Sequence, residues 1–197
     1  MENLNFDKNG DGLIPAVIQD ATTLKVLMLG YMNREAYEKS VKEGVVTFFS
    51  RTKKRLWTKG ETSGNFLHIV SIADDCDNDT LLIKVNPVGV VCHTGSMSCF
   101  NTSETEGFIR KLEQVVVGRK KEMPEGSYTT HLFTKGTAKI AQKVGEEAVE
   151  TVIEAMADNR ERLIYESSDL IYHLLVLLAH KEIPLSEIEA ELAQRHK

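Results

Sequence analysis

The sequence contains little cysteine, tryptophan and proline, and it lacks a long apolar run. Its 197 residues include three cysteines, one tryptophan and four prolines. Three thiols cannot all pair as disulfides, so we expect buried side chains, metal ligands or a reactive thiol in a reducing compartment. The longest apolar run, Leu170–Ala179, is shorter than the ~20 residues of a membrane-spanning helix. The first residues, MENLNFDKNGDG, lack the apolar core of a signal peptide, so we expect a cytoplasmic protein without a membrane partner.

An excess of basic residues is also missing. The formal net charge is -5 and the sequence pI is about 5.7. Without a general positive field, nucleic acid is not an expected partner. Hydrophobic residues make up 42% of the chain and charged residues 27%, as in an ordinary globular protein. The length allows one large domain or two small ones.

The pattern of apolar residues changes near residue 106. Before Phe100, short segments rich in Val, Ile, Leu and Phe are separated by Gly, Asn, Asp or Pro, which is typical of strands. The expected strands lie within residues 26–32, 45–51, 67–73 and 80–92, with a short helix at 34–42. Later apolar residues recur at helical spacing within residues 108–121, 136–157, 160–181 and 185–195. The sequence predicts an α+β protein of two domains, β-rich at residues 1–106 and all-helical at residues 107–197.

An early segment, DKNGDGLIPAVI, begins like a calcium-binding loop. Asp7, Asn9 and Asp11 have the right spacing, but the twelfth position is Ile18 instead of a bidentate Glu. Pro15 also lies inside the segment. We therefore interpret it as an Asn/Asp/Gly turn that leads into a strand.

The run ADDCDNDTLLIKV, residues 73–85, combines acids with a thiol. If residues 75–80 are extended, Asp75, Asp77 and Asp79 line one face and Cys76 lies on the other. Three carboxylates suit Mg²⁺, whereas a thiolate suits Zn²⁺. The alternative is an Asp-rich turn exposed to water.

The other two cysteines lie in VVCHTGSMSCF, residues 90–100. A bend at Pro87–Gly89 would bring Cys92 back beside Cys76 within one chain. Together with Cys99, they would form a three-cysteine zinc site that keeps a fourth position open for water. His93, next to one ligand, is a candidate proton carrier or additional ligand. The alternative is three buried cysteines.

The segment SRTKKRLWTKGETSGNF, residues 50–66, mixes cations, hydroxyl groups and glycines. These groups suit a phosphate monoester, and the tryptophan is suited to stack on a base. The candidate substrate-binding residues are Arg51, Trp57, Lys59, Thr62, Ser63 and Gly64. The alternative is a charged hairpin with one core tryptophan.

The helical half carries two groups of carboxylates at helical spacing. GEEAVE supplies Glu146, Glu147 and Glu150, and taken alone this face is that of an ordinary surface helix. ESSD supplies Glu166 and Asp169 on a helix that is apolar nearly all round, where carboxylates need a cation or a metal. Together they predict a Mg²⁺ site for a polyphosphate substrate.

Several of these motifs resemble known families. DCDND, CHTGSMSCF and WTKGETSGN resemble phosphoribosyl-AMP cyclohydrolase. EEAVE followed by ESSD resembles the MazG-like all-α pyrophosphohydrolases, and PEGSYTTHLFTKGTAKIAQKVGEE narrows this to phosphoribosyl-ATP pyrophosphohydrolase. Their order resembles the bacterial bifunctional enzymes of histidine biosynthesis.

The resemblance implies two hydrolytic reactions. The C-terminal domain, a MazG-like helical bundle, would convert phosphoribosyl-ATP to phosphoribosyl-AMP and pyrophosphate, with Mg²⁺ on the five carboxylates and Glu147 and Glu150 as catalytic groups. The N-terminal domain would open the adenine ring of phosphoribosyl-AMP between N1 and C6, using Zn²⁺ on the cysteines and Mg²⁺ on the aspartates. It also implies a homodimer whose zinc ligands come from both chains.

Two other functions compete with this one. The first is a general nucleoside triphosphate pyrophosphatase with a zinc-binding accessory domain. The second is a non-enzymatic protein, in which a zinc-stabilised β domain is joined to a helical dimerisation bundle.

Overall fold

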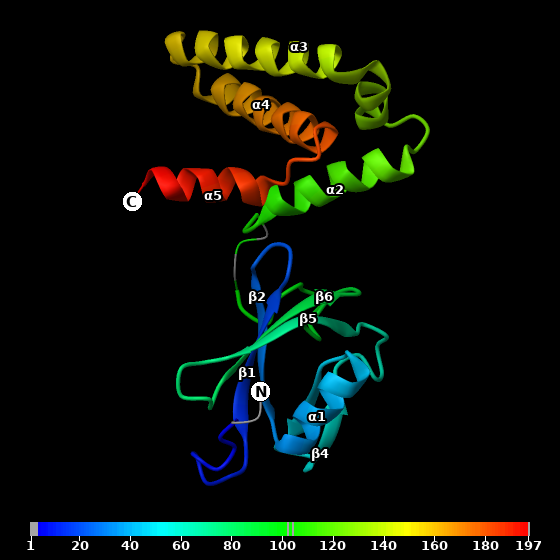
Figure 1. The fold of residues 1–197 in the computed structure, drawn as a ribbon, viewed down its shortest axis with the longest axis vertical. Helices are drawn as coiled ribbons and strands as arrows, with labels where there is room; N and C mark the ends of the chain where they lie inside the picture. Colours follow the sequence, from blue (N-terminus) through cyan, green and yellow to red (C-terminus); the bar gives the residue numbers. More distant parts are fainter. Residues whose placement is uncertain (1–3, 102, 104, 197) are drawn as a thin grey trace. The chain divides into compact units, whose positions relative to one another are not determined.

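The computed structural model describes residues 4–101, 103 and 105–196, and the chain divides into two compact units. The first unit is Met1–Phe108 and the second is Ile109–Lys197 (Figure 1). Strands dominate the first unit and helices the second, so the predicted α+β fold class is confirmed. Each unit is described by itself.

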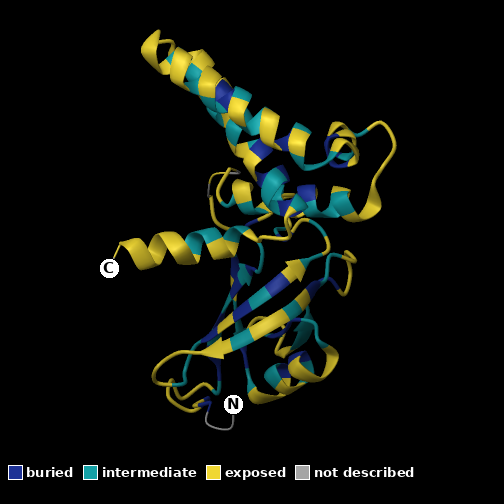
Figure 2. Cartoon of the chain, turned by 45° about the horizontal axis from the view of Figure 1, so that its top comes forward, coloured by how far each residue is buried: buried dark blue, intermediate teal, exposed yellow. Residues whose placement is uncertain are grey.

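The main sheet of the β-rich unit has the strand order β2-β1-β6-β5. Its strands are β1 (Ile14–Asp20), β2 (Val26–Met32), β5 (Leu67–Asp74) and β6 (Leu81–Pro87). β1 pairs antiparallel with β2 and parallel with β6, and β5 pairs antiparallel with β6. Buried and half-buried residues alternate along β1, as in a sheet with one face on a core, and Figure 2 shows bands of differing burial along the strands.

A second sheet of two strands completes the core. It pairs β3 (Thr47–Ser50) with β4 (Arg55–Thr58), and Phe48 of β3 stacks on Trp57 of β4 with ring centroids 5.8 Å apart. Phe48 is buried and also lies against Gly30 of β2, where an added Cβ would be 2.3 Å from the phenyl Cδ1. Only glycine permits this close approach of strand and ring.

Helix α1 (Arg34–Glu43) connects the two sheets along the chain. Asn33 caps its first turn by accepting a hydrogen bond from the Ala36 N–H at 2.9 Å. Gly44 ends it with φ 70°, a left-handed conformation that favours glycine. Buried Ser40 accepts a hydrogen bond from the Thr47 N–H at 2.8 Å, which fixes α1 beside β3.

The helical unit contains α2 (Phe108–Glu122), α3 (Tyr128–Met156), α4 (Arg160–His180) and α5 (Leu185–Arg195). The short connection between α3 and α4 makes them an antiparallel hairpin, and Asn159 caps α4 by accepting from the Arg162 N–H at 3.2 Å. The core of this unit draws on α2, α3 and α4. It consists of Val116, Leu132, Phe133, Ile140, Val176 and Ala179.

Helix α3 begins earlier than the sequence pattern indicates. The apolar spacing predicts a helix from residue 136, whereas the structure places helix from Tyr128, after the capping residue Ser127. Gly136 interrupts it with φ 76° and ψ -173°, so the predicted start coincides with a kink. Within residues 4–101, 103 and 105–196, none of the helices combines the length and apolar character that a membrane crossing demands.

The Gly30–Phe48 contact yields a stability prediction. Gly30→Ala places a methyl group against the ring, so we expect the free energy of unfolding to fall by about 1–3 kcal/mol. Urea unfolding followed by fluorescence of Trp57, the single tryptophan, reports on this unit.

Two variants control this experiment. Phe48→Leu in combination with Gly30→Ala should cost less than the sum of the single changes, because the clash is shared. Gly118→Ala in α2, where an added Cβ would meet open space beyond its own helix, should leave the Trp57 transition unchanged. Equal stability of Gly30→Ala and the parent would contradict the close contact.

Candidate metal centres and active-site cavity

The segment Asp75–Thr80, which we call the acid turn, joins β5 to β6. The Asp75 carboxylate accepts hydrogen bonds from the Asp79 N–H at 3.0 Å and the Thr80 N–H at 3.1 Å. Asn78 adopts the left-handed φ of 60° that closes the turn. The prediction of an extended segment with acids and thiol on opposite faces is therefore wrong.

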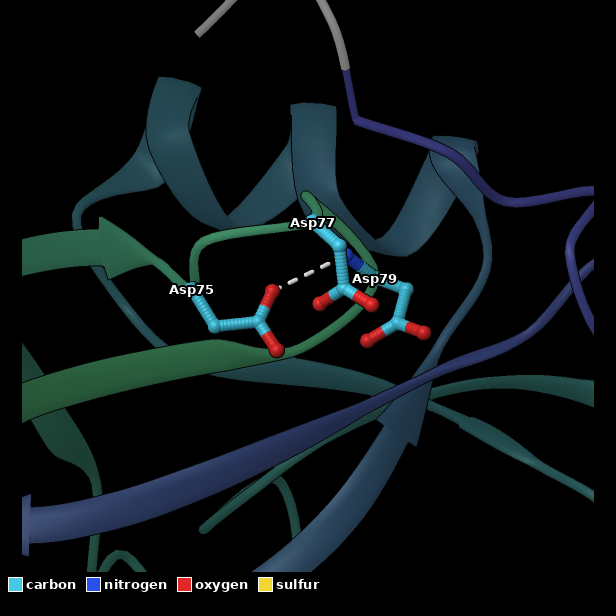
Figure 3. Close-up of side chains that lie close together, drawn as sticks. All are labelled: Asp75, Asp77 and Asp79. Carbon is cyan, nitrogen blue, oxygen red and sulfur yellow. Dashed lines mark hydrogen bonds between the residues drawn. The ribbon is translucent and has the colours of Figure 1, made fainter.

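The turn nevertheless gathers the three predicted carboxylates. Asp75, Asp77 and Asp79 each offer an oxygen within 4.8 Å of the others, and Figure 3 shows the three side chains on one turn. Oxygen donors at this separation suit a hard divalent cation such as Mg²⁺. Backbone hydrogen bonds, rather than strand alternation, produce the cluster.

A lysine from the segment that resembled a calcium loop lies against this cluster. The Lys8 ammonium pairs with Asp77 and with Asp79, the latter at 2.5 Å between Nζ and Oδ2. Hydrogen bonds to Asp77 and then Asp79 raise the pKa of Lys8, and Lys8 in turn lowers the pKa of Asp79. Sequence reasoning missed this lysine, since its partner lies about 70 residues away.

The segment Cys92–Cys99, which we call the thiol loop, is tied to β2 after the chain leaves β6. The Cys99 N–H donates to the Leu27 carbonyl at 2.7 Å, and the Ser98 hydroxyl donates to the Val26 carbonyl at 2.8 Å. Within the loop, the Cys92 N–H donates to the Ser96 carbonyl at 2.9 Å. These bonds hold the Cys92 and Cys99 thiols near each other.

The two thiols of the loop differ in acidity. A hydrogen bond from the Thr94 hydroxyl, 3.1 Å from Sγ, is the main cause that lowers the pKa of Cys92 to about 6. Burial and the neighbouring Cys92 raise the pKa of Cys99. The lowered pKa favours the thiolate of Cys92, the form that binds metal or acts as a nucleophile.

Cys76 does not join this pair within one chain. Among the described residues, the two groups of three or more potential ligand side chains within 4.8 Å are carboxylate groups, and neither contains a cysteine. Cys76 is exposed on the acid turn, while Cys92 and Cys99 belong to the thiol loop. The predicted bend that brings Cys92 beside Cys76 in a single chain is therefore wrong, because the loop after β6 is bonded to β2.

A cavity of about 530 Å³ lies between the thiol loop and the turn that follows β4. It brings together many of the predicted residues from both segments. Its lining consists of Met28, Trp57, Lys59, Gly60, Thr62, Ser63, Asn65, Val90, Val91, Cys92, His93, Gly95 and Cys99. Lys59 is buried there, and its charge acts to lower the pKa of Cys99 against the opposing effects of burial and Cys92.

Two predicted substrate-binding residues lie elsewhere. The Arg51 guanidinium lies over the Tyr31 ring, 3.8 Å from its centroid, and Arg51 does not line the cavity. Gly64 shapes the turn through its φ of 76° and a hydrogen bond from its N–H to the Gly60 carbonyl at 2.9 Å. Trp57 lines the cavity but also stacks on Phe48, so part of its surface belongs to the core.

Asn65 is a cavity residue that sequence reasoning missed. An added Cβ at Gly89 would lie 2.7 Å from the Asn65 Oδ1, so the Pro-Val-Gly bend packs closely on this amide. The GETSGN motif contained the residue, but its letters alone do not distinguish a lining side chain from a turn former.

In the helical unit, three carboxylates from two helices converge. Glu147 and Glu150 of α3 and Glu166 of α4 have oxygens within 4.8 Å of one another. Glu147 is 4% exposed and Glu166 2%, so α3 carries a buried carboxylate that the pattern of this helix taken alone does not indicate. Glu150 is exposed, but partial desolvation beside its neighbours, followed by repulsion from Glu147 and Glu166, raises its pKa. Such a cluster suits a divalent cation.

Two cations flank these carboxylates, as burial of charge requires. Lys143 Nζ lies 2.6 Å from Glu147 Oε1 and 2.9 Å from Glu146 Oε2, and it lowers the pKa of Glu146. Arg162 pairs with Glu166 from the same helix. Glu146 therefore lies beside the cluster with Lys143 as its partner, and is not one of the three convergent acids.

Buried His173 links the carboxylates to the start of α3. Its Nδ1 lies 2.9 Å from the Asp169 carbonyl oxygen and 3.8 Å from Glu147 Oε1. Because a carbonyl only accepts, Nδ1 carries hydrogen, and Nε2 lies 3.2 Å from the Tyr128 hydroxyl oxygen. Asp169 is half-buried one turn after Glu166 and is not among the three convergent acids.

Comparison with known proteins decides the family. A phosphoribosyl-AMP cyclohydrolase model matches residues 28–101, and a phosphoribosyl-ATP pyrophosphohydrolase model matches residues 109–196. The chain is 60% identical to "Histidine biosynthesis bifunctional protein HisIE" of Bacteroides thetaiotaomicron over 98% of this chain and 96% of that protein. The corresponding proteins of Escherichia coli K12 and Vibrio vulnificus are 54% and 50% identical, covering 98% and 100% of this chain and 96% and 94% of theirs. The chain belongs to the bifunctional HisIE family.

Membership of the HisIE family confirms the predicted function and enzyme class. The family combines a cyclohydrolase with a pyrophosphohydrolase, in the predicted order. It does not support the general nucleoside triphosphate pyrophosphatase or the non-enzymatic protein. The cavity with its two thiols falls in the cyclohydrolase match, and the three convergent glutamates fall in the pyrophosphohydrolase match. Lys8 precedes the matched residues.

The hydrogen bond from Thr94 to Cys92 yields a prediction on thiol reactivity. In Thr94→Val the thiolate loses its hydroxyl donor, so the pKa of Cys92 should rise from about 6 towards its ordinary value. Iodoacetamide should then label Cys92 several-fold more slowly at pH 7 in metal-free protein, as mass spectrometry of the Cys92 peptide can measure.

The matched control is Thr105→Val, which removes an exposed hydroxyl bonded to Ser103 at 2.7 Å. This variant should label like the parent. An unchanged pH midpoint for labelling in Thr94→Val would show that the hydroxyl does not set the acidity.

Proposed function

We propose that the β-rich unit opens the adenine ring of phosphoribosyl-AMP in the 530 Å³ cavity. The observation that carries this assignment is the meeting of two separate segments at one cavity, the thiol loop and the turn after β4. One contributes Cys92, His93 and Cys99, and the other Trp57 and Lys59. Binding the base, binding the phosphate and hydrolysing the ring require these side chains to lie around one cavity.

The proposed reaction adds water to C6 of the N1-alkylated ring and then breaks the bond between C6 and N1. Zn²⁺ held by thiolates would supply an activated water. His93, whose Nδ1 lies 3.8 Å from Cys92 Sγ, is placed to take a proton from that water and return it to N1. Lys59, Thr62 and Ser63 supply donors for the phosphate, and Trp57 supplies an aromatic surface for the base.

We propose two metals for this unit. Cys92 and Cys99 fit part of a zinc site, since one thiol is already acidic, and the acid turn offers oxygen ligands for Mg²⁺. Because Cys76 lies apart from the other two thiols, a three-cysteine site needs Cys76 from a second chain. A homodimer with zinc ligands from both chains supplies it.

The helical unit is proposed to hydrolyse phosphoribosyl-ATP to phosphoribosyl-AMP and pyrophosphate. Glu147, Glu150 and Glu166 would hold Mg²⁺, with Glu146 and Asp169 as flanking acids. The raised pKa of Glu150 makes it a candidate to take a proton during the reaction. We further propose a division of the chain into domains at residues 1–106 and 107–197, and a cytoplasmic location.

Paired substitutions should separate the two reactions. Cys92→Ser removes a zinc ligand, so we expect loss of ring opening with pyrophosphate release retained. Glu147→Gln removes a buried carboxylate from the glutamate cluster, so pyrophosphate release should be lost while supplied phosphoribosyl-AMP is still opened. Both products can be followed with purified protein, Zn²⁺ and Mg²⁺.

Circular dichroism confirms that each variant is folded, and the retained reaction serves as its internal control. A folded Cys92→Ser protein that still opens the ring would overturn the zinc assignment. Pyrophosphate release by Glu147→Gln at the parent rate would overturn the assignment of the glutamate cluster.

Mixing two inactive variants should test whether the zinc site is shared. If Cys76 of one chain completes the site of another, Cys76→Ser and Cys92→Ser chains can form a hybrid dimer with one intact site. Random exchange of equal amounts makes about half of the dimers hybrids, so ring opening should recover to about a quarter of the parent rate.

Each variant mixed with itself is the control and should stay inactive, while pyrophosphate release should be the same in every mixture. Absence of recovery, in mixtures that mass spectrometry shows to contain hybrid dimers, would place all ligands on one chain or reject a ligand role for Cys76.

A further inference from the structure

The segment before β1 holds a lysine in a fixed place beside the acid turn. Leu4 and Phe6 are each 5% exposed and belong to the core of the β-rich unit. Between them, the Asn5 N–H donates to the carbonyl of Asn78, inside the acid turn, at 2.8 Å. Lys8 therefore leaves the core two residues after an anchored phenyl ring.

Lys8 contacts the same carboxylates that the proposed Mg²⁺ site would use. Its ammonium pairs with both Asp77 and Asp79, two of the three acids whose oxygens lie within 4.8 Å of one another. An ammonium group and a divalent cation satisfy the same oxygen lone pairs, and each repels the other. The Lys8 ammonium group and a divalent metal therefore cannot contact the same carboxylate oxygens at the same time.

We propose that Lys8 is a tethered cation that competes with the divalent metal for the acid turn and so sets the metal affinity of the site. This inference rests on the proposed role of the acid turn as a Mg²⁺ site. Without metal, Lys8 relieves the repulsion among the aspartates and keeps the turn in its binding conformation. With metal, Lys8 leaves the carboxylates.

The surroundings of Lys8 allow this exchange. Its side chain is 41% exposed and that of Asp77 is 56% exposed, so the ammonium group has water to move into. The anchors, Leu4 and Phe6, do not need to move, because the lysine stem is flexible. The segment DKNGDG is thus not a calcium loop, but it does carry a group that acts on a metal site.

Calorimetric titration of the zinc-loaded full chain with Mg²⁺ tests the proposal. Lys8→Met removes the competing charge, so the acid turn should bind Mg²⁺ about three- to tenfold more tightly, in line with two exposed ion pairs. Lys8→Arg keeps the charge and should stay close to the parent. Lys42→Met, which removes an exposed lysine from α1, controls for net charge.

A double substitution separates the possible failures. In an Asp77→Asn background Lys8→Met should strengthen Mg²⁺ binding less than in the parent, because only the ion pair of Lys8 with Asp79 remains. An effect on the glutamate cluster would instead be unchanged by Asp77→Asn. If Asp77→Asn alone leaves Mg²⁺ binding unchanged, the acid turn is not a Mg²⁺ site and the proposed metal site is wrong. If Asp77→Asn weakens binding but Lys8→Met does not strengthen it, or weakens it, the tethered-cation proposal alone is wrong.

Discussion

Repulsion between clustered carboxylates is the constraint on which both sites of this chain depend. Three aspartates meet on the acid turn and three glutamates meet between α3 and α4. Like charges so close are tolerated only with cations beside them. Lys8 serves the first group, and Lys143 and Arg162 the second. The carboxylates that these two lysines and the arginine neutralise are the same groups that would attract a divalent metal.

The two units build these clusters with different local means. In the β-rich unit a turn closed by Asn78 and by hydrogen bonds to Asp75 folds one short segment onto itself. In the helical unit the hairpin of α3 and α4 brings together residues about 20 positions apart. Two acids of the first cluster, Asp75 and Asp77, are exposed, so water shares in its solvation. Glu147 and Glu166 are buried and depend on their cationic partners.

Periodicity was sufficient to predict the fold class and most elements, because strand and helix patterns are local. The sites depended on contacts that local patterns do not contain. Strand alternation failed at Asp75–Thr80, since a left-handed Asn78 and bonds to Asp75 decide that conformation. The burial of Glu147 follows from α4 packing on α3, and the position of Cys92 follows from the bonds that tie Ser98 and Cys99 to β2. Candidate site residues could thus be chosen from the sequence, whereas the contacts that they make in the folded chain could not be predicted.

The parallel pairing of β1 with β6 bears on how the chain folds. Ala16 lies opposite Leu81, so the centre of the main sheet joins segments about 65 residues apart. The helical unit is built around a hairpin with short connections, and contacts of small sequence separation form faster than distant ones. We therefore expect the helical unit to refold in the earlier kinetic phase. The acid turn and the thiol loop, which depend on the closed sheet, would acquire their final form in the later one.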